Sequence, residues 1–166
     1  MLWVFLIVAL AIFIFGSVLL FGAPYLPTLK AQTLTALELL ALKPGQTLLE
    51  LGSGDGRVLK AAAKQGVHAV GYEINPLLVL FSKINTWHYR QMVTVHWRNY
   101  WRVSLPPADG IYVFLLQRYM QKLDDKLGHD FPNGIRLVSF AFAFPNHQPA
   151  ATRGGVMLYE LKPDAS

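Results

Sequence analysis

Apolar residues are distributed unevenly along the chain, and the pattern first changes near residue 23. Residues 1–22 read MLWVFLIVALAIFIFGSVLLFG, and 20 of the first 23 residues are apolar with none charged. A helix over residues 1–22, at a rise of about 1.5 Å per residue, is about 33 Å long, enough to cross the hydrocarbon core of a bilayer. Pro24 and Pro27 would end this helix.

A cleaved signal peptide is the alternative for this segment. It requires a basic region before the apolar run, and the first Lys or Arg of the chain is Lys30. We therefore predict an uncleaved, single-pass transmembrane anchor over residues 1–23. All Lys and Arg residues follow it, which predicts that the folded domain lies on the cytoplasmic side of the membrane, the inner or plasma membrane in a bacterium.

After residue 23 the pattern changes to short apolar runs that alternate with segments of helical periodicity. The apolar runs predict strands over residues 46–51, 67–72, 93–97, 110–115, 135–142 and 156–161. The helical segments are residues 28–42, 55–65, a stretch beginning at Asn75-Pro76, and 117–127.

Three details support these helices. Leu34, Leu37, Leu40 and Ala41 share one side of the first helix. Gly66 and Gly128 are expected to end the second and fourth helices. The third begins with Asn as N-cap and Pro in the first turn, and continues with apolar residues at helical spacing, namely Leu77, Leu80, Phe81, Ile84 and Trp87.

Strands that alternate with helices predict an α/β fold, a Rossmann-like doubly wound parallel sheet. Residues 24–45 are then a linker and a helix that precedes the domain, and residues 46–166 are the domain itself. Ligands of such sheets bind beyond the carboxyl ends of the strands. The residues that directly follow each strand are therefore the candidates for a site.

Composition narrows the function classes. The chain has no cysteine, which excludes a disulfide framework, a cysteine nucleophile and a cysteine-ligated metal. The histidines at positions 68, 88, 96, 129 and 147 have no metal-ligand spacing, so we predict no metal site. The net charge of +5 contains no dense basic run, which indicates attraction to an anionic membrane leaflet more than nucleic-acid binding.

The loop after the first predicted strand carries the strongest signal. Gly52, Gly54 and Gly56 alternate between that strand and the next helix, which allows a tight turn and a close backbone approach to a ligand. A dinucleotide-binding fingerprint needs its third glycine at position 57, which is Arg57. Glu50 lies two residues before the first glycine. This combination resembles the glycine motif of class I S-adenosylmethionine (SAM) methyltransferases.

Two further strand ends extend the candidate site. Glu73 ends the second predicted strand, 17 residues after Gly56, where a carboxylate can accept hydrogen bonds from both ribose hydroxyls. Asn99 follows the third strand, where related methyltransferases usually have an acid that binds adenine, and an amide can serve the same purpose. Tyr100 or Trp101 could stack on the base, although packing in the core is the alternative.

The whole chain resembles one family, the membrane-anchored seven-β-strand protein-lysine methyltransferases. Its mitochondrial members modify the adenine nucleotide translocase and the c subunit of ATP synthase, and bacterial relatives share the architecture. The matching segments are 24–28 (PYLPT), 51–58 (LGSGDGRV), 71–76 (GYEINP), 113–115 (VFL), 123–127 (LDDKL), 136–139 (RLVS) and 144–145 (FP). The anchor together with Pro27-Thr28 makes this resemblance more specific than the glycine motif alone.

The resemblance implies a set of cofactor-binding residues, namely Thr28, Glu50, Gly52, Ser53, Gly54, Asp55, Gly56, Glu73, Asn75, Asn99 and Tyr100. The chain departs from the family at Gln117, where a proline is usual, and at Asn99. The tail after Phe144 is also short, with room for a hairpin or one antiparallel strand.

The predicted activity is methylation, with SAM as cofactor, of a lysine on a membrane protein, with the anchor holding the enzyme on the lipid bilayer. Transfer from a sulfonium needs alignment rather than a metal or a covalent intermediate. Gln117 and Tyr100 are the candidate catalytic residues, in positioning roles, and Tyr100, Trp101, Tyr112 and Tyr119 could line an acceptor channel. A small or lipidic acceptor and a non-catalytic assembly factor are the alternatives.

Overall fold

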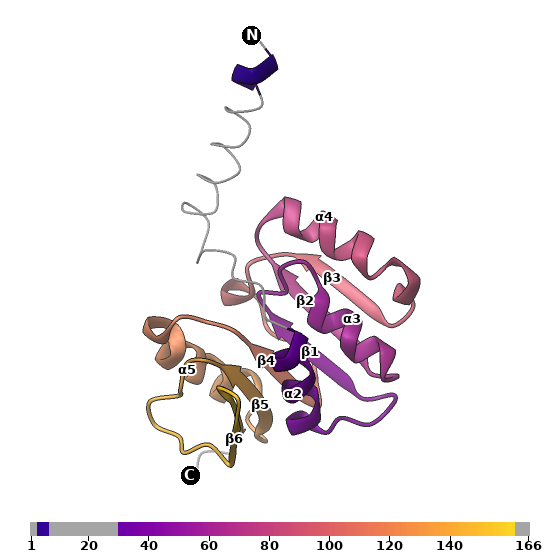
Figure 1. Ribbon diagram of the computed structural model, residues 1–166. Coiled ribbons are helices and arrows are strands. Elements are labelled where there is room, and N and C mark those ends of the chain that lie inside the picture. Colours follow the sequence, from indigo (N-terminus) through magenta and orange to yellow (C-terminus); the bar gives the residue numbers. More distant parts are fainter. Residues whose placement is uncertain (1–2, 7–29, 162–166) are drawn as a thin grey trace.

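The computed structural model describes residues 3–6 and 30–161. Its centre is one seven-stranded sheet, and most of its strands are labelled in Figure 1. The strands are β1 (Thr47–Leu51), β2 (His68–Glu73), β3 (Val93–Trp97), β4 (Gly110–Val113), β5 (Ile135–Phe140), β6 (Ala151–Arg153) and β7 (Val156–Leu161). Their order is β3-β2-β1-β4-β5-β7-β6. The first five strands in this order run parallel, and β7 runs antiparallel to both neighbours.

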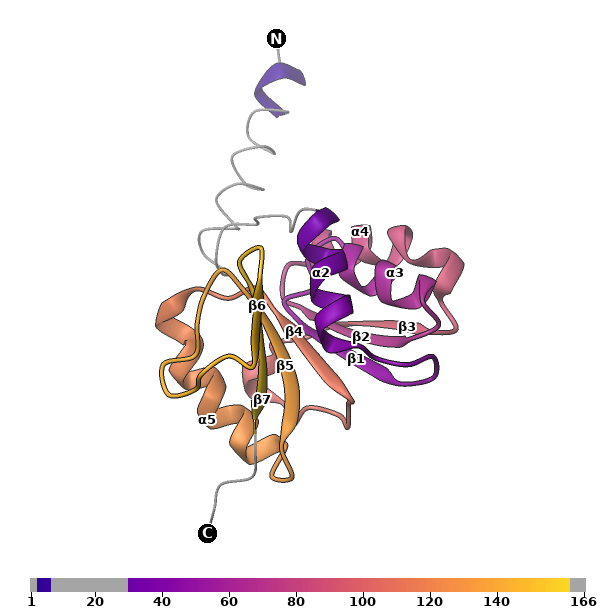
Figure 2. The ribbon, with the colours of Figure 1, turned by 60° about the horizontal axis from the view of Figure 1, so that its bottom comes forward.

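Helices cover both faces of the sheet (Figure 2). The α-helices are α2 (Lys30–Leu40), α3 (Arg57–Lys64), α4 (Pro76–Asn85) and α5 (Met120–Asp130), and the 3-10 turns are η1 (Trp87–Tyr89), η2 (Tyr100–Arg102) and η3 (Gln117–Tyr119). One buried cluster joins α2, α3 and α4 to the sheet, and a second joins α5 to the other face. The predicted doubly wound α/β architecture is confirmed, and the chain reverses direction across the sheet between β1 and β4.

The C-terminal end of the sheet matches the predicted hairpin. β6 and β7 pair antiparallel, and β7 also pairs with β5 over residues 135–140. β5 is shorter than predicted, because Ala141 has φ of 68° and leaves the extended conformation. The predicted strand over residues 110–115 likewise ends at Val113.

One helix end was predicted wrongly. Gly128 lies inside α5, which continues to Asp130, and nothing lies within 4 Å of the position that a Cβ would take there. Leu34 and Ala41 are exposed, and the buried face of α2 consists of Thr33, Ala36, Leu37 and Leu40. Gly66, with φ of 79°, does follow the end of α3 as predicted.

The apolar spacing correctly predicted helix α4, but that apolar face points to solvent. Val79 and Ser82 are the buried residues of this helix. The apolar residues that defined the periodicity are exposed by 39–63%: Leu77 39%, Leu80 54%, Phe81 57%, Ile84 63% and Trp87 61%. The main contacts of α4 in the described part of the chain are with β2, with the edge strand β3, with α3 and with η1, and the exposed apolar residues lie on the side of the helix away from its buried residues Val79 and Ser82.

The predicted anchor over residues 1–23, the linker and Thr28 lie for the most part outside the described residues. Residues 3–6 form a helical turn, and α2 begins at Lys30. Within residues 3–6 and 30–161, no helix is both long enough and apolar enough to cross a membrane.

Candidate functional site

The glycine loop between β1 and α3 is held against the end of β2. Gly52, Gly54 and Gly56 all have positive φ, at 89°, 53° and 77°. The Gly52 and Ser53 backbone N–H groups both donate to the Tyr72 carbonyl, at 2.9 Å each. Gly56 is the N-cap of α3, and a Cβ at this position would collide with Ser82 Oγ of α4. The three glycines therefore adopt a backbone conformation that other residues rarely take, and at Gly56 a side chain would also collide with α4.

Glu73 joins this loop to the end of β2. Its Oε2 accepts from the Gly54 N–H at 2.9 Å, and its Oε1 accepts from the N–H groups of Ile74 and Asn75 at 2.8 Å each. The side chain is buried. A carboxylate has about four acceptor positions, so three backbone donors leave one for a ligand hydroxyl. Glu73 therefore both orders the loop and can bind a ligand at the same place.

Glu50, in β1, and Ser53, in the loop, are buried with unsatisfied polar atoms. Glu50 Oε2 and Ser53 Oγ have no hydrogen-bond partner. Burial raises the pKa of Glu50 well above its ordinary value of 4.5, and the negative charges of Asp55 and Glu73 raise it further, while the Leu59 backbone and Arg57 partly offset the shift. A buried acid with a raised pKa, next to a glycine loop, is typical of a functional site.

Two predicted asparagines act as local caps. Asn75 Oδ1 accepts from the N–H groups of Leu77 and Leu78, at 2.9 and 3.4 Å, and so caps α4. Asn99 Oδ1 accepts from the Trp101 N–H at 3.0 Å and caps η2. Asn99 also follows β3 beside Glu73, since Trp97 pairs with Glu73 and the Arg98 N–H donates to the Glu73 carbonyl. The Asn99 amide nitrogen takes no part in this cap, so it can face a ligand.

Asp55 extends the loop toward α3. Its carboxylate forms an ion pair with Arg57, with 2.7 Å between Oδ2 and Nη2. It also accepts from the Arg57 backbone N–H at 3.2 Å. In this structure Asp55 therefore stabilises the first turn of α3.

The predicted aromatic residues of the acceptor side partly come together. The rings of Tyr100 and Trp101 are 4.7 Å apart between centroids, and those of Trp101 and Tyr119 are 6.3 Å apart. Burial, then the charge of Glu73 and then Tyr119 raise the pKa of Tyr100 above its ordinary value of 10, so its hydroxyl stays neutral. Tyr112 differs, because it is buried in the core on the α2 and α3 side of the sheet.

Gln117 connects the loops that follow β4 and β5. Its Nε2 donates to the Ala143 carbonyl at 2.9 Å, and the side chain is exposed. The amide Oε1 therefore still offers an acceptor at the carboxyl edge of the central strands. This placement is compatible with its predicted positioning role.

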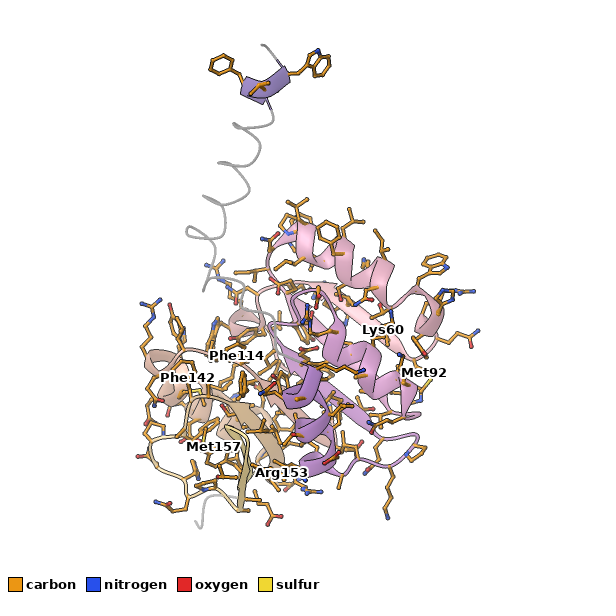
Figure 3. All side chains as sticks on the ribbon, in the orientation of Figure 1. Lys60, Met92, Phe114, Phe142, Arg153 and Met157 are labelled. Atoms are coloured by element: carbon orange, nitrogen blue, oxygen red, sulfur yellow. The ribbon has the colours of Figure 1, made fainter. Side chains whose placement is uncertain are left out.

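Three features of this edge were missed from the sequence. Phe114 and Phe142 stack with centroids 6.4 Å apart and lie next to each other in Figure 3. Ala141, between β5 and Phe142, has a positive φ that is uncommon outside glycine and marks local strain. A Cβ on Gly71 of β2 would lie 2.6 Å from Leu59 Cδ1 and 2.8 Å from Ser53. Phe-x-Phe-Pro at 142–145 was the only signal for the aromatic pair.

Together these groups form a hydrogen-bonding loop beside an aromatic edge. Within the part of the chain that the structure describes, no group of three or more His, Cys, Asp or Glu side chains could hold a metal ion. The arrangement can bind an organic cofactor with hydroxyl groups at Glu73 and a planar base near Asn99.

Comparison with known proteins identifies the same region. Residues 50–151 match the model of the ANTKMT methyltransferase domain. The adenine nucleotide translocase lysine N-methyltransferase of Mus musculus is 39% identical over 134 residues, which are 79% of this chain and 58% of that protein. The lysine N-methyltransferase of Xenopus laevis that is named for the c subunit of ATP synthase is 37% identical over 130 residues, 76% of this chain and 56% of that protein. The chain thus spans little more than half the length of these two relatives.

A solved structure gives a third comparison. The RNA methyltransferase from Salinibacter ruber, in complex with S-adenosyl-L-homocysteine, superposes with a TM-score of 0.76 at 28% identity. The match covers 85% of this chain and 96% of that chain.

Proposed function

The chain belongs to the ANTKMT methyltransferase domain family, and from this membership we propose that it is a SAM-dependent protein-lysine methyltransferase. We further propose that its acceptor is a lysine of a membrane protein, and that residues 1–23 tether the enzyme to the same membrane on the cytoplasmic side. The observation that carries the proposal is the glycine loop bound directly to Glu73, through the hydrogen bond from Gly54.

The residues of this site fit SAM. The remaining acceptor position of Glu73 suits a ribose hydroxyl, and Asn99 suits the adenine edge. Ser53, in the loop, and Glu50, in β1 before it, have unsatisfied buried oxygens that suit the amino-acid end of the cofactor. Bound SAM supplies an electrophilic methyl group, and the protein needs only to align it with a nucleophile. The Salinibacter ruber structure, in which a protein of similar fold holds S-adenosyl-L-homocysteine, supports this assignment.

A lysine acceptor must lose a proton before it can attack. With an ordinary pKa near 10.4, about one lysine in a thousand is neutral near pH 7.4, a cost of about 4 kcal/mol. The adjacent rings of Tyr100, Trp101 and Tyr119 offer an apolar surface that lowers the amine's pKa by desolvation. Gln117 Oε1 can accept a hydrogen bond from the amine and orient it.

Two measurements test the proposal on the full-length chain. Titration calorimetry with SAM should show binding, and a chain that binds no SAM would exclude both catalytic hypotheses and leave an assembly role. Membranes incubated with the chain and radiolabelled SAM should carry label on protein lysines. Label in solvent-extractable lipid would favour the lipidic acceptor instead, and label in RNA would favour the activity named for the Salinibacter ruber protein.

A further inference from the structure

The outward side of α4 and η1 carries an unusual apolar surface. Leu77, Leu80, Phe81 and Ile84 are spaced three and four residues apart, so they form one row along the helix, and Trp87 continues the row into η1. We call these five residues the α4 apolar face. All five are exposed, and α4 lies at the margin of the helical layer over the edge strand β3 (Figure 1). A continuous exposed apolar row of this kind indicates an interaction surface.

The charges around this face are mostly positive. Residues 55–109 contain seven Lys or Arg and three acids, of which Glu73 is buried and accepts from three backbone N–H groups, and Asp55 is paired with Arg57. Lys83 lies on α4, and the Arg90 guanidinium lies 5.1 Å from the centre of the Trp87 ring. The opposite side differs, because α5 carries three aspartates beside its lysines. The basic excess is therefore located on the same part of the molecule as the apolar face.

Tryptophan side chains occur at both ends of α4. Trp97 is exposed and its Nε1 donates to the Ile74 carbonyl at 3.0 Å, next to the start of the helix, while Trp87 follows the end. Tryptophan is enriched at the boundary between lipid and water, because its ring is apolar and its N–H is polar. Apolar residues between two tryptophans and beside basic side chains are typical of a helix that lies in a membrane surface.

The charges also discriminate between possible occupants of this face. A second copy of the chain, packed through the same face, would bring its own Lys83 and Arg90 to the contact and so would add positive charge rather than neutralise it. Residues 1–29 contain no acidic residue, so that segment offers nothing to neutralise the basic side chains. The anionic headgroups of a bilayer neutralise them, and the acyl boundary accepts the apolar row.

The entry point of the chain lies on the same side of the molecule. Lys30, the first residue of α2, and Asn85, the last residue of α4, line one cavity of about 570 Å³, together with Arg57, Lys60 and Lys64 of α3. The Lys60 ammonium donates to Asn85 Oδ1 at 2.8 Å, which connects α3 to the end of α4. A tether that precedes Lys30 thus joins the domain beside α4.

We propose that the α4 apolar face docks on the surface of a bilayer that contains anionic lipid. This contact is additional to the tether and would fix the orientation of the domain. Asn75, which caps α4, lies two residues after Glu73, so docking would hold the candidate site next to the membrane surface. The inference rests on the proposed membrane location but does not require methyl transfer.

The absence of cysteine makes a depth measurement direct, because one introduced cysteine carries one label. Ile84→Cys places an environment-sensitive fluorophore on the α4 apolar face, and Asp125→Cys places it on exposed α5 as the matched control. Each full-length variant is reconstituted in nanodiscs of phosphatidylcholine with phosphatidylglycerol and a lipid that quenches fluorescence in the acyl region. We expect strong quenching at position 84 and little at position 125.

The charge dependence gives the second arm of the experiment. Lys83→Gln and Arg90→Gln should each lower the ratio of docked to undocked domain about fivefold, and discs of pure phosphatidylcholine should lower it as well. Equal quenching at positions 84 and 125 would overturn the proposal. Quenching that changes neither with lipid charge nor with these substitutions would overturn it as well. The proposal would also be overturned if, without lipid, position 84 became protected from solvent as the protein concentration rose. That result would indicate a contact with a second copy of the chain.

The outcomes separate this inference from the proposed function. SAM affinity is measured on the same samples. A domain that binds SAM but does not dock contradicts the docking proposal alone, and a domain that docks without binding SAM contradicts the proposed activity alone.

Discussion

Glu73 shows how one side chain can serve both the architecture and the ligand. Its carboxylate accepts from the N–H groups of Gly54, Ile74 and Asn75, and so fixes the glycine loop to β2 before any ligand binds. The sequence predicted the ligand role, because a carboxylate at this strand end suits a ribose. It could not predict the bonds to the loop, since they depend on how two loops approach each other in space.

Glu73→Gln therefore tests more than the loss of charge. The amide replaces one acceptor oxygen with an N–H₂ group, which must face a backbone N–H donor. Hydrogen bonds to charged groups contribute about 1.5–3 kcal/mol each, so we expect SAM affinity to fall roughly tenfold to hundredfold. Titration calorimetry measures this, with Glu160→Gln, at an exposed position of β7, as the control. A dissociation constant within about twofold of the wild type would contradict this role.

Glu50 gives a prediction about pH. Burial raises its pKa in the folded chain above the ordinary 4.5, so the folded state holds the proton more tightly than the unfolded state does. Below pH 4.5 the Glu50 carboxyl is mostly protonated in both the folded and the unfolded chain, so its burial does not lower stability through charge. As the pH rises above that value toward the raised pKa, the free energy of unfolding falls, by at most about 1.4 kcal/mol per pH unit from this group.

The measurement compares Glu50→Gln with the wild type by urea denaturation at pH 5 and pH 8. We expect the stability of the variant relative to the wild type to increase with pH, because an amide does not ionise. Glu160→Gln, exposed on β7, should show no such trend. If the difference between Glu50→Gln and the wild type is the same at both pH values, the carboxyl does not titrate as inferred.

Gly71 and Gly128 form a matched pair for packing. A Cβ at Gly71 would overlap Leu59 Cδ1 and Ser53, whereas at Gly128 it meets nothing within 4 Å. We expect Gly71→Ala to destabilise the fold by about 1–3 kcal/mol, because the core and the loop must shift. Gly128→Ala, in the interior of α5, should stabilise it by about 0.5–1 kcal/mol. Equal effects in chemical denaturation would show that Gly71 is not tightly packed.

At the scale of elements, the sequence predicted most helices and strands but not how they face each other. Asn75-Pro76 and the spacing of Leu77, Leu80 and Ile84 correctly indicated a helix. The same spacing does not show whether other elements pack on the apolar side. In the fold, Val79 and Ser82 are the buried residues of this helix. Periodicity reports a helix, whereas burial depends on the neighbouring elements, which for α4 lie only on one side.

Element ends were harder to predict for a related reason. Gly128 was expected to end its helix, but α5 continues through it because the last buried contact, Leu127, and the ion pair of Lys126 with Asp130 stabilise the final turn. The residues of the glycine loop could be predicted more accurately than the helix ends, since a turn that needs positive φ is marked in the sequence by glycines. The stacking of Phe114 with Phe142 joins two separate strand ends, so the local sequence around Phe142 could not indicate its partner.

The contact between the loops after β4 and β5 gives a prediction at this scale. Gln117→Ala removes the hydrogen bond to the Ala143 carbonyl, which connects the two loops beside the aromatic edge. A neutral hydrogen bond contributes about 0.5–1.5 kcal/mol, so we expect kcat for a lysine acceptor to fall roughly twofold to tenfold. SAM affinity should be unchanged, because the hydrogen bond of Gln117 is to the loop after β5 and not to the glycine loop. A loss confined to SAM affinity would place Gln117 in cofactor binding instead.

At the scale of the whole molecule, the proposed tether and the compact domain divide the work between them. Strands β1 to β3 supply the loop and the carboxylate that suit a cofactor, and the edge of β4 and β5 supplies the aromatic surface. In the described part of the chain, no separate domain is present to select an acceptor. Proximity to a membrane would then supply selectivity, since tethering raises the effective concentration of acceptors in the same bilayer.

Removal of residues 1–23 tests this division directly. We expect methylation of lysines in intact membranes to fall on the order of 10²-fold, while SAM affinity stays unchanged, because tethering alone contributes that much. A chain in which residues 1–23 are replaced by an unrelated uncharged apolar segment of the same length should recover the activity, since the proposed role depends on residence in the bilayer and not on specific contacts. Scintillation counting of labelled membrane protein gives the rate, and calorimetry shows whether the domain is intact. If the truncated chain methylates membranes as fast as the full chain, acceptor selection must instead depend on the surface of the domain, with the α4 apolar face as its first candidate.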